Sequence, residues 1–405
     1  TISSTVAMNG PKARKSIESL YREEVSQGTF RWSSFSDMEN AKDLPYLDEE
    51  FAAAAAFFRM ASDIALQNQQ NQQLYYLALP DTTLTVAQNL CDILNWYADT
   101  LVEKKDDNKE EGEENKQIGA ELDSRTDAIP IIRFTVTPSK NRNNKQQQLE
   151  KRAQQRKQLP TGEDTERGTK AWVKRLLVQL GICPFTKSEI KSGQGLGDLG
   201  VPVANIMYRH SSALSCEGND VYLLMADAWE AISDMVAAGP SGKSGVSSIL
   251  LSAPGFDDDF ALWAGPVFAM LETCVGAIQG EEMVGIVCFH PQYVTPDGKS
   301  WPGFGHMHSV PRLKQWYEEH GSSSSSPSST TQTLSDNEIA AGGAWQRRTP
   351  HAVINVLRAE QLEAAEGRRR SGELYERNIR VLVGKEEDSI GLEKLEGDLK
   401  REQCL

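Results

Sequence analysis

The sequence predicts an α/β (α+β) protein: a small sheet of three to four strands covered by helices, preceded by a smaller helix-rich α+β domain. Segments with apolar residues at helical spacing alternate with short apolar runs of β type that end at proline, as at Leu74–Pro80 and Val246–Pro254. Hydrophobic residues make up 39% of the 405 residues, and the deficit lies in polar runs. The segments between those runs can therefore still form cores.

The polar runs also define the expected domain organisation. The first ten residues are rich in hydroxyl side chains and lack acids, which is typical of a transit-peptide remnant and equally of a fragment boundary. The expected parts are an N-terminal domain over 11–138 with an acidic insert at 104–118, a polar linker over 139–167, a C-terminal α/β domain over 168–384 with a Ser-rich low-complexity insert at 321–337, and a charged tail over 385–405.

In the N-terminal domain, apolar periodicity and proline positions place the elements. The expected helices are Lys12–Val25, Leu47–Gln67 and Val86–Leu101, and the expected strands are Leu74–Leu79 and Ile129–Val136. Residues 74–136 thus have a strand–helix–insert–strand order. Residues 220–253 repeat this order if Val221–Met225 is a strand, which indicates either an internal repeat or ordinary α/β alternation.

The C-terminal domain is expected to alternate helices with strands. The expected helices are Ala171–Leu180, Phe256–Ala277, Pro350–Ala364 and Gly372–Asn378, and the expected strands are Val203–Tyr208, Val246–Ser252, Met283–Phe289 and a short Ile379–Val383. Gly181 is placed like a helix C-cap, and Pro184 cannot continue the helix.

Charge, hydropathy and cysteine usage argue against nucleic-acid-binding, membrane-spanning and disulfide-bonded classes of protein. A formal net charge of −14 disfavours nucleic acid as a partner. No apolar run approaches the ~18 residues that a membrane span needs. The six cysteines form no CxxC pair, which favours free thiols in a reducing intracellular compartment, with a plastid consistent with the N-terminus.

Two residues are candidates for catalysis. Cys183 starts a Cys-Pro-Phe turn like those of thiol redox sites, but the helix before it disfavours a thiolate unless Pro184 begins a new helical turn. His290 ends a predicted strand, where sites of α/β folds gather, and suits acid/base work. Packing of a turn by Cys183 and a structural role for His290 remain equally open.

Anion and metal binding have weaker candidates. Arg347 and Arg348 place two guanidinium groups at the start of a predicted helix, and with Arg358 they suit either the clamp of a carboxylate or phosphate or surface salt bridges. Arg348 and Arg358 are assigned to the clamp, with Tyr293 beside His290 as a further substrate contact. The pair His306 and His308 lacks an obvious third ligand, so no metal residues are predicted. The acids Asp257–Asp259 suit the cap of a helix. Residues 239–244 lack the helix-opening context of a phosphate-binding loop and predict a turn.

Three motifs in order resemble a known family. They are Gly181-Ile182-Cys183-Pro184-Phe185, then Phe289-His290-Pro291-Gln292-Tyr293, then Arg348-Thr349-Pro350 followed by Val356-Leu357-Arg358. Over residues 168–365 the chain resembles the bacterial and plastid family called domain of unknown function 1415, whose members read roughly GLNLCPF, SFHPxYxF and NRSPYPxLHLLRE. The chain departs from that pattern at Arg347, His351 and Asn355, and it lacks an acid before Ile249.

These observations leave three hypotheses. The first is an enzyme acting on a small anionic molecule, in which Cys183, His290 and Arg348 converge in one pocket. The second is a non-catalytic interaction or assembly protein, whose inserts would dock protein partners. The third and weakest is a metal-binding protein.

Overall fold

The chain is α+β, as predicted, with one four-stranded and one six-stranded mixed sheet. The computed structural model describes residues 11–33, 49–66, 73–106, 117–137, 145–197, 201–215, 220–238, 245–299, 307–321, 334–366, 370–385 and 389–405. The chain divides into two compact units, and neither is continuous in sequence. The first comprises Thr1–Gln158, Ser212–Gly239 and Pro266–Glu282, and the second comprises Leu159–Ser211, Pro240–Gly265 and Met283–Leu405.

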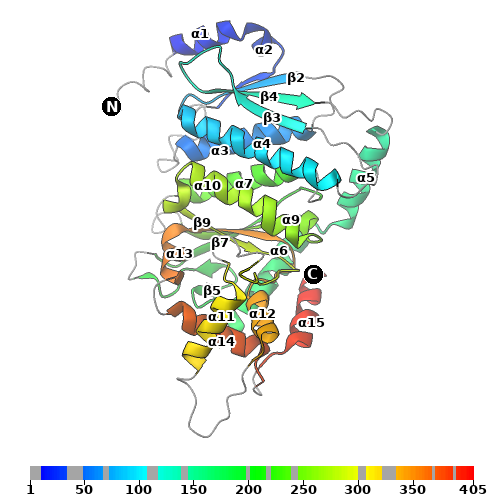
Figure 1. The fold of residues 1–405 in the computed structure, drawn as a ribbon, viewed down its shortest axis with the longest axis vertical. Helices are drawn as coiled ribbons and strands as arrows, with labels where there is room; N and C mark the ends of the chain where they lie inside the picture. The colour runs from blue at the N-terminus through cyan, green and yellow to red at the C-terminus, as the bar shows by residue number, and fades with distance from the viewer. Residues whose placement is uncertain are drawn as a thin grey trace. The chain divides into compact units, whose positions relative to one another are not determined.

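The first unit is built on a sheet of order β1-β2-β4-β3, here called sheet A. Its strands are β1 (Phe30–Trp32), β2 (Gln73–Ala78), β3 (Gln117–Leu122) and β4 (Ile131–Thr137), and its helices are α1 (Pro11–Leu20), α2 (Arg22–Ser26), α3 (Glu49–Leu66), α4 (Leu84–Asp106), α5 (Lys145–Gln158), α7 (Asp220–Ala237) and α10 (Phe268–Ala277), with a 3-10 turn η8 (Gly280–Glu282). Helices α3 and α4 cover one face of sheet A (Figure 1). On that face Phe57 packs on Phe134, and Asn95 bonds the backbone of Ala120. Helix α3 packs on α7, and α4 packs on α10.

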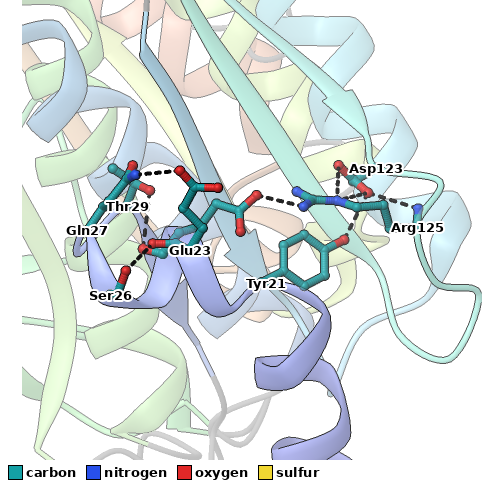
Figure 2. A network of polar contacts seen from close by, with 8 residues as sticks. Tyr21, Glu23, Ser26, Gln27, Thr29, Asp123 and Arg125 are labelled. Carbon is teal, nitrogen blue, oxygen red and sulfur yellow. Dashed lines mark hydrogen bonds and ion pairs between the residues drawn. The ribbon is translucent and has the colours of Figure 1, made fainter.

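The other face of sheet A carries α1 and α2, held there by a polar network. Figure 2 shows Tyr21 and Arg125 turned toward Asp123. The Tyr21 hydroxyl donates to Asp123 at 2.8 Å, and Arg125 donates to Asp123 and, at 2.6 Å, to Glu24. The Arg125 guanidinium also lies 3.8 Å from the centroid of the Tyr21 ring. Because Tyr21 is fully buried, these bonds fix the two helices on the sheet.

The second unit is built on a sheet of order β5-β6-β7-β8-β10-β9, here called sheet B, which exceeds the predicted three to four strands. Its strands are β5 (Thr186–Ser188), β6 (Lys191–Ser192), β7 (Ala204–His210), β8 (Val246–Ser252), β9 (Val284–Phe289) and β10 (Val353–Arg358). Its helices are α6 (Gly162–Trp172), the π-helix η4 (Val173–Gln179), η6 (Pro254–Phe256), α9 (Phe260–Leu262), α11 (Val310–Gly321), α12 (Asp336–Trp345), α13 (Ala359–Glu366), α14 (Arg370–Val383) and α15 (Leu392–Gln403), and η7 (Trp263–Val267) follows α9. One core joins a face of sheet B to α6, η4, α11, α12, α14 and α15.

The two sheets share one topology. The order β1–α3–β2–α4–β3–β4 gives strand order β1-β2-β4-β3, and the order β7–α7–β8–α10–β9–β10 gives β7-β8-β10-β9, with the same parallel and antiparallel pairs. Two backbone hydrogen bonds also correspond. In sheet A the Ser33 N–H donates to the Ala78 carbonyl, and in sheet B the Ser211 N–H donates to the Ser252 carbonyl. Likewise, the Leu79 N–H donates to the Pro130 carbonyl in sheet A, and the Ala253 N–H donates to the Ala352 carbonyl in sheet B. We call residues 30–137 the first repeat and residues 204–358 the second repeat.

The internal repeat was therefore predicted in the wrong register. Val221–Met225 was expected to be a strand, but it forms the start of α7. Most of this helix is buried, so its first turns form a nearly continuous apolar run like that of a buried strand.

Two further element predictions were wrong at the C-terminal side. Pro350–Ala364 was expected to be helical, whereas Val353–Arg358 is β10, paired with both β8 and β9. Ile379–Val383 was expected to be a strand, but it is the end of α14.

Some predictions fall outside the described residues. These are the first ten residues, most of the acidic insert, the loop 239–244, His306 and the serine tract 322–329.

Among the described helices, one stretch is long and apolar enough to cross a membrane by length and composition, although no such run was expected. It is Phe260–Ala277, and 50% of it is buried within the structure. This is weak evidence for a span, because the core helix of a globular unit meets the same test. The backbone also leaves helical geometry at Gly265, which precedes Pro266.

Candidate functional site

A pocket of about 210 Å³ lies on the core face of sheet B. Its walls come from η4, the turn after it, all six strands of the sheet, the connector before β10, and α13 and α14. Its apolar lining comprises Val173, Leu177, Ile182, Pro184, Phe185, Leu196, Ile206, Leu250, Val287, Phe289, Leu357, Leu362 and Leu374, and its polar lining comprises Cys183, Thr186, Ser192, Ser248, His308, Gln346, Arg347, Asn355, Gln361, Ser371, Tyr375 and Asn378. A mostly apolar pocket with a few polar groups is the usual form of a small-molecule site.

The charge in this pocket comes from Arg347. Among the lining residues, all of which belong to the described part of the chain, Arg347 is the single Lys or Arg, and none is Asp or Glu. Burial lowers the pKa of Arg347, but the phenols of Tyr375 and Tyr293 outweigh burial, so the pKa is raised overall. The guanidinium lies 5.5 Å from the centroid of the Phe289 ring, in the cation–π range. The pocket therefore offers a fixed positive charge inside apolar walls.

Two amides of the pocket serve the fold. The Asn378 side-chain amide donates to the Ile182 carbonyl and to the Gln346 side-chain oxygen, both at 2.9 Å, and its oxygen accepts from Arg377. The Gln346 amide donates to the Gly342 carbonyl at 3.2 Å. These bonds tie the turn after η4 to α14 and to the end of α12.

Asn355, another of the four side-chain amides that line the pocket, is bonded differently. Asn355 lies on β10, and its side-chain oxygen accepts a hydrogen bond of 2.6 Å from the Ser248 hydroxyl on β8. In the part of the chain that the structure describes, no bond to its amide nitrogen is found. Its side chain is half-buried on the pocket wall, so this nitrogen can donate to a ligand.

Cys183 lines the pocket, on a turn that the structure explains. Gly181 has φ +63°, which confirms the predicted C-cap, and Ile182 N–H bonds back to the Leu176 carbonyl. Arg377 donates to the Gly181 carbonyl at 2.8 Å and to the Leu180 carbonyl at 3.3 Å. The Arg377 guanidinium therefore offsets the negative end of the η4 helix dipole beside Cys183. The sequence did not reveal this contact.

His290 is not among the residues that line this pocket, contrary to the predicted convergence. Its Nε2 donates to the Phe256 carbonyl at 2.9 Å, and its Nδ1 accepts from the Gln292 N–H at 3.0 Å. Burial lowers the pKa of His290 to about 4. A fully buried, neutral ring with both nitrogens bonded holds its loop in place, and it has no nitrogen left for proton transfer to a ligand.

The predicted anion clamp does not form either. Arg348 donates to the Tyr293 carbonyl at 3.3 Å and lies over the Trp345 ring, and Arg358 donates to the Val246 carbonyl at 3.2 Å. Tyr293 is buried with its ring against Phe260. None of the three lines the pocket, and the arginine that does line it, Arg347, was not chosen from the sequence.

The remaining candidates have structural partners. Asp259 caps α9 by accepting from the Leu262 N–H at 2.8 Å, as predicted for these acids. Asp257 instead accepts from His351 Nδ1 at 2.8 Å and from the Ala352 N–H at 2.7 Å. The His308 ring packs on Trp316 and Tyr375. Within the described ranges, no group of three or more His, Cys, Asp or Glu residues could hold a metal ion.

Comparisons with known proteins identify no relative. The chain matches no protein-family model, and searches of curated proteins and of solved structures give no significant match. The resemblance described above thus stays a prediction. Two of the positions at which the chain departs from that family pattern, Arg347 and Asn355, line the pocket.

Proposed function

We propose that the second unit binds a small amphipathic anion, a compact apolar molecule that carries one carboxylate, in the pocket on sheet B. One observation carries the proposal: the pocket has apolar walls, one guanidinium, and no carboxylate among its described lining residues. A buried Arg–carboxylate contact is charge-assisted and geometrically specific. A cavity of about 150 Å³ can hold benzene, so about 210 Å³ suits a molecule of roughly eight to ten heavy atoms.

Hexanoate is a suitable probe, and isothermal titration calorimetry of the full chain is the measurement. Hexanoate should bind with one site per chain, whereas hexylammonium, of similar size and opposite charge, should not bind. Arg347→Gln should weaken hexanoate at least tenfold, because a hydrogen bond to a charged group contributes about 1.5–3 kcal/mol. Arg312→Gln, which removes an exposed charge from α11 in the same unit, is the matched control.

The same substitution at Arg348 separates this proposal from the sequence-based one. Arg348→Gln should leave hexanoate affinity within threefold, since Arg348 bonds a backbone carbonyl outside the pocket lining. If Arg348→Gln weakens binding and Arg347→Gln does not, the site has been assigned to the wrong arginine. If hexanoate does not bind at all, the proposed function is wrong.

Cys183 provides a second test of occupancy. Its side chain is half-buried on the pocket wall, so bound hexanoate should slow its alkylation by iodoacetamide. Cys404 is exposed at the end of α15 and should be alkylated at the same rate with or without hexanoate. Mass spectrometry of the two cysteine peptides measures both rates in one sample. Equal protection of both thiols, or of neither, would contradict occupancy of this pocket.

A further inference from the structure

The pocket also indicates what else its ligand carries, and this inference rests on the proposed function. We propose that the anion bears a hydrogen-bond acceptor, such as a ketone or amide oxygen, several carbons away from its carboxylate. Asn355 would donate to that acceptor. Arg347 would bind the carboxylate.

Asn355 differs from Asn378 and Gln346 in the bonds it makes; the fourth amide of the lining, Gln361, has a buried nitrogen without a hydrogen-bond partner among the described residues. Asn378 and Gln346 each use both the donor and the acceptor of the amide on the protein. Asn355 uses only its oxygen, which accepts from Ser248. This bond fixes which end of the amide faces the pocket: the oxygen is turned to Ser248, so the NH₂ group is the end presented to a ligand. An apolar ligand alone would leave that donor unsatisfied on the wall of the pocket, which is unfavourable.

Strand register sets the spacing between the two ligand contacts. The Arg347 guanidinium lies over Phe289 of β9. Asn355 of β10 pairs with Val287, which is also on β9. Phe289 and Val287 are two residues apart and point to the same face of sheet B. Two residues of a strand span about 6.6 Å. Asn355 lies on the neighbouring strand, about 5 Å further across the sheet, so the two contacts are separated both along and across the strands. Such a separation fits an oxo group at carbon 4 or 5 of a short chain and not one at carbon 2, beside the carboxylate.

Three acids of equal chain length test the spacing: hexanoate, 2-oxohexanoate and 5-oxohexanoate. On the full chain, 5-oxohexanoate should bind about threefold to tenfold more tightly than the other two, the usual gain from one neutral hydrogen bond. Asn355→Leu keeps the shape of the side chain and should remove this preference. Ser248→Ala should reduce the preference, because the amide could then rotate. Arg347→Gln should weaken all three acids alike and keep the preference.

The outcomes separate the inference from the proposed function. Equal affinity for the three acids would overturn the acceptor and leave anion binding intact. A preference for 2-oxohexanoate, or a preference for 5-oxohexanoate that survives in Asn355→Leu, would also overturn it. No binding of any acid would overturn both. A thermal unfolding curve for each variant, superimposable on that of the native chain, shows that lost affinity is not lost folding.

Discussion

The two repeats share one sheet topology but differ in the segments that connect and cover the strands. Both have the strand order and pairing described above, and in both an aromatic residue before the first strand bonds the connector between the third and fourth strands. Tyr21 donates to Asp123 in the first repeat, and the Trp172 indole donates to the Arg348 carbonyl at 2.8 Å in the second. The connectors themselves differ: residues 123–130 in one, and residues 290–352, with α11 and α12, in the other.

In the second repeat the long connector forms part of the pocket. It supplies His308, Gln346 and Arg347, while η4, the turn after it and the helices after β10 supply the remaining cover over the sheet. In the first repeat, Arg125 of the short connector donates to Glu24 of α2, and the described part of that face carries an exposed Arg133–Glu121 pair. The same sheet can therefore carry a pocket where a longer connector and additional flanking helices cover one of its faces.

The largest expected effect concerns the aromatic anchor of the second repeat. Trp172→Ala should lower the free energy of unfolding by about 3–5 kcal/mol, because it removes a buried indole that packs on Phe289 and loses the bond to Arg348. Trp172→Phe should cost much less, since most of the packing remains. Urea unfolding measures both variants. A loss below about 1 kcal/mol for Trp172→Ala would mean that Trp172 does not anchor this connector.

The next effect is a difference in acid sensitivity. The pKa of His290 is lowered by burial to about 4, whereas the imidazole of an unfolded chain titrates near 6.5. Between these values the unfolded state binds the proton and the folded state does not, so stability is present above about pH 6.5 and is lost as the pH falls toward 4. The loss is about 3 kcal/mol. His290→Gln should remove this slope in urea unfolding from pH 7 to pH 4. An unchanged slope would contradict the neutral, doubly bonded ring.

The first repeat should respond at lower pH and by a smaller amount. Burial raises the pKa of Asp123, but hydrogen bonds from Arg125 and Tyr21 outweigh it, so the pKa is lowered overall. Its stabilisation is present above the carboxyl pKa of an unfolded chain, near 4, and is lost as the pH falls below that. Asp123→Asn should cost about 2 kcal/mol at pH 7 and flatten the profile below pH 4. Hydrogen exchange of the α1 and α2 amides should rise in this variant. A profile that steepens instead would rule out the ionised network.

The sequence predicted the elements whose pattern is local. Val246–Ser252 has the predicted bounds, and the helix expected at Leu47–Gln67 is α3, because an apolar run before Pro254 and an alanine-rich segment each show their structure in a short window. Val353–Arg358 could not be predicted in this way. Its strand exists because β8 and β9 pair with it on both sides, and those partners lie far away in the chain.

The same limit explains the site. Cys183 lies on the pocket wall, on a turn that a glycine cap and a proline mark locally in the sequence. Asn355 could not be found while its segment was interpreted as a helix, since the alternation of a strand puts it on the pocket face. Arg347 and Arg348 are neighbours in a turn without periodicity, so the sequence could not show which of them faces the pocket.

The smallest effects compare two glycines that end the leading helices. Gly28 has φ +71° with open space around its Cα, and Gly181 has φ +63° with Arg377 Nη2 at 3.1 Å from an added Cβ. Gly28→Ala should cost about 1 kcal/mol from backbone strain alone. Gly181→Ala should lower the free energy of unfolding by the same amount and by a few tenths of a kcal/mol more, because Arg377 must shift from the carbonyls that it caps. It should also weaken hexanoate about twofold by moving Cys183, whereas Gly28→Ala should leave hexanoate affinity unchanged. Titration calorimetry and urea unfolding of the pair test this. Equal effects on affinity would show that the turn after η4 does not position the pocket.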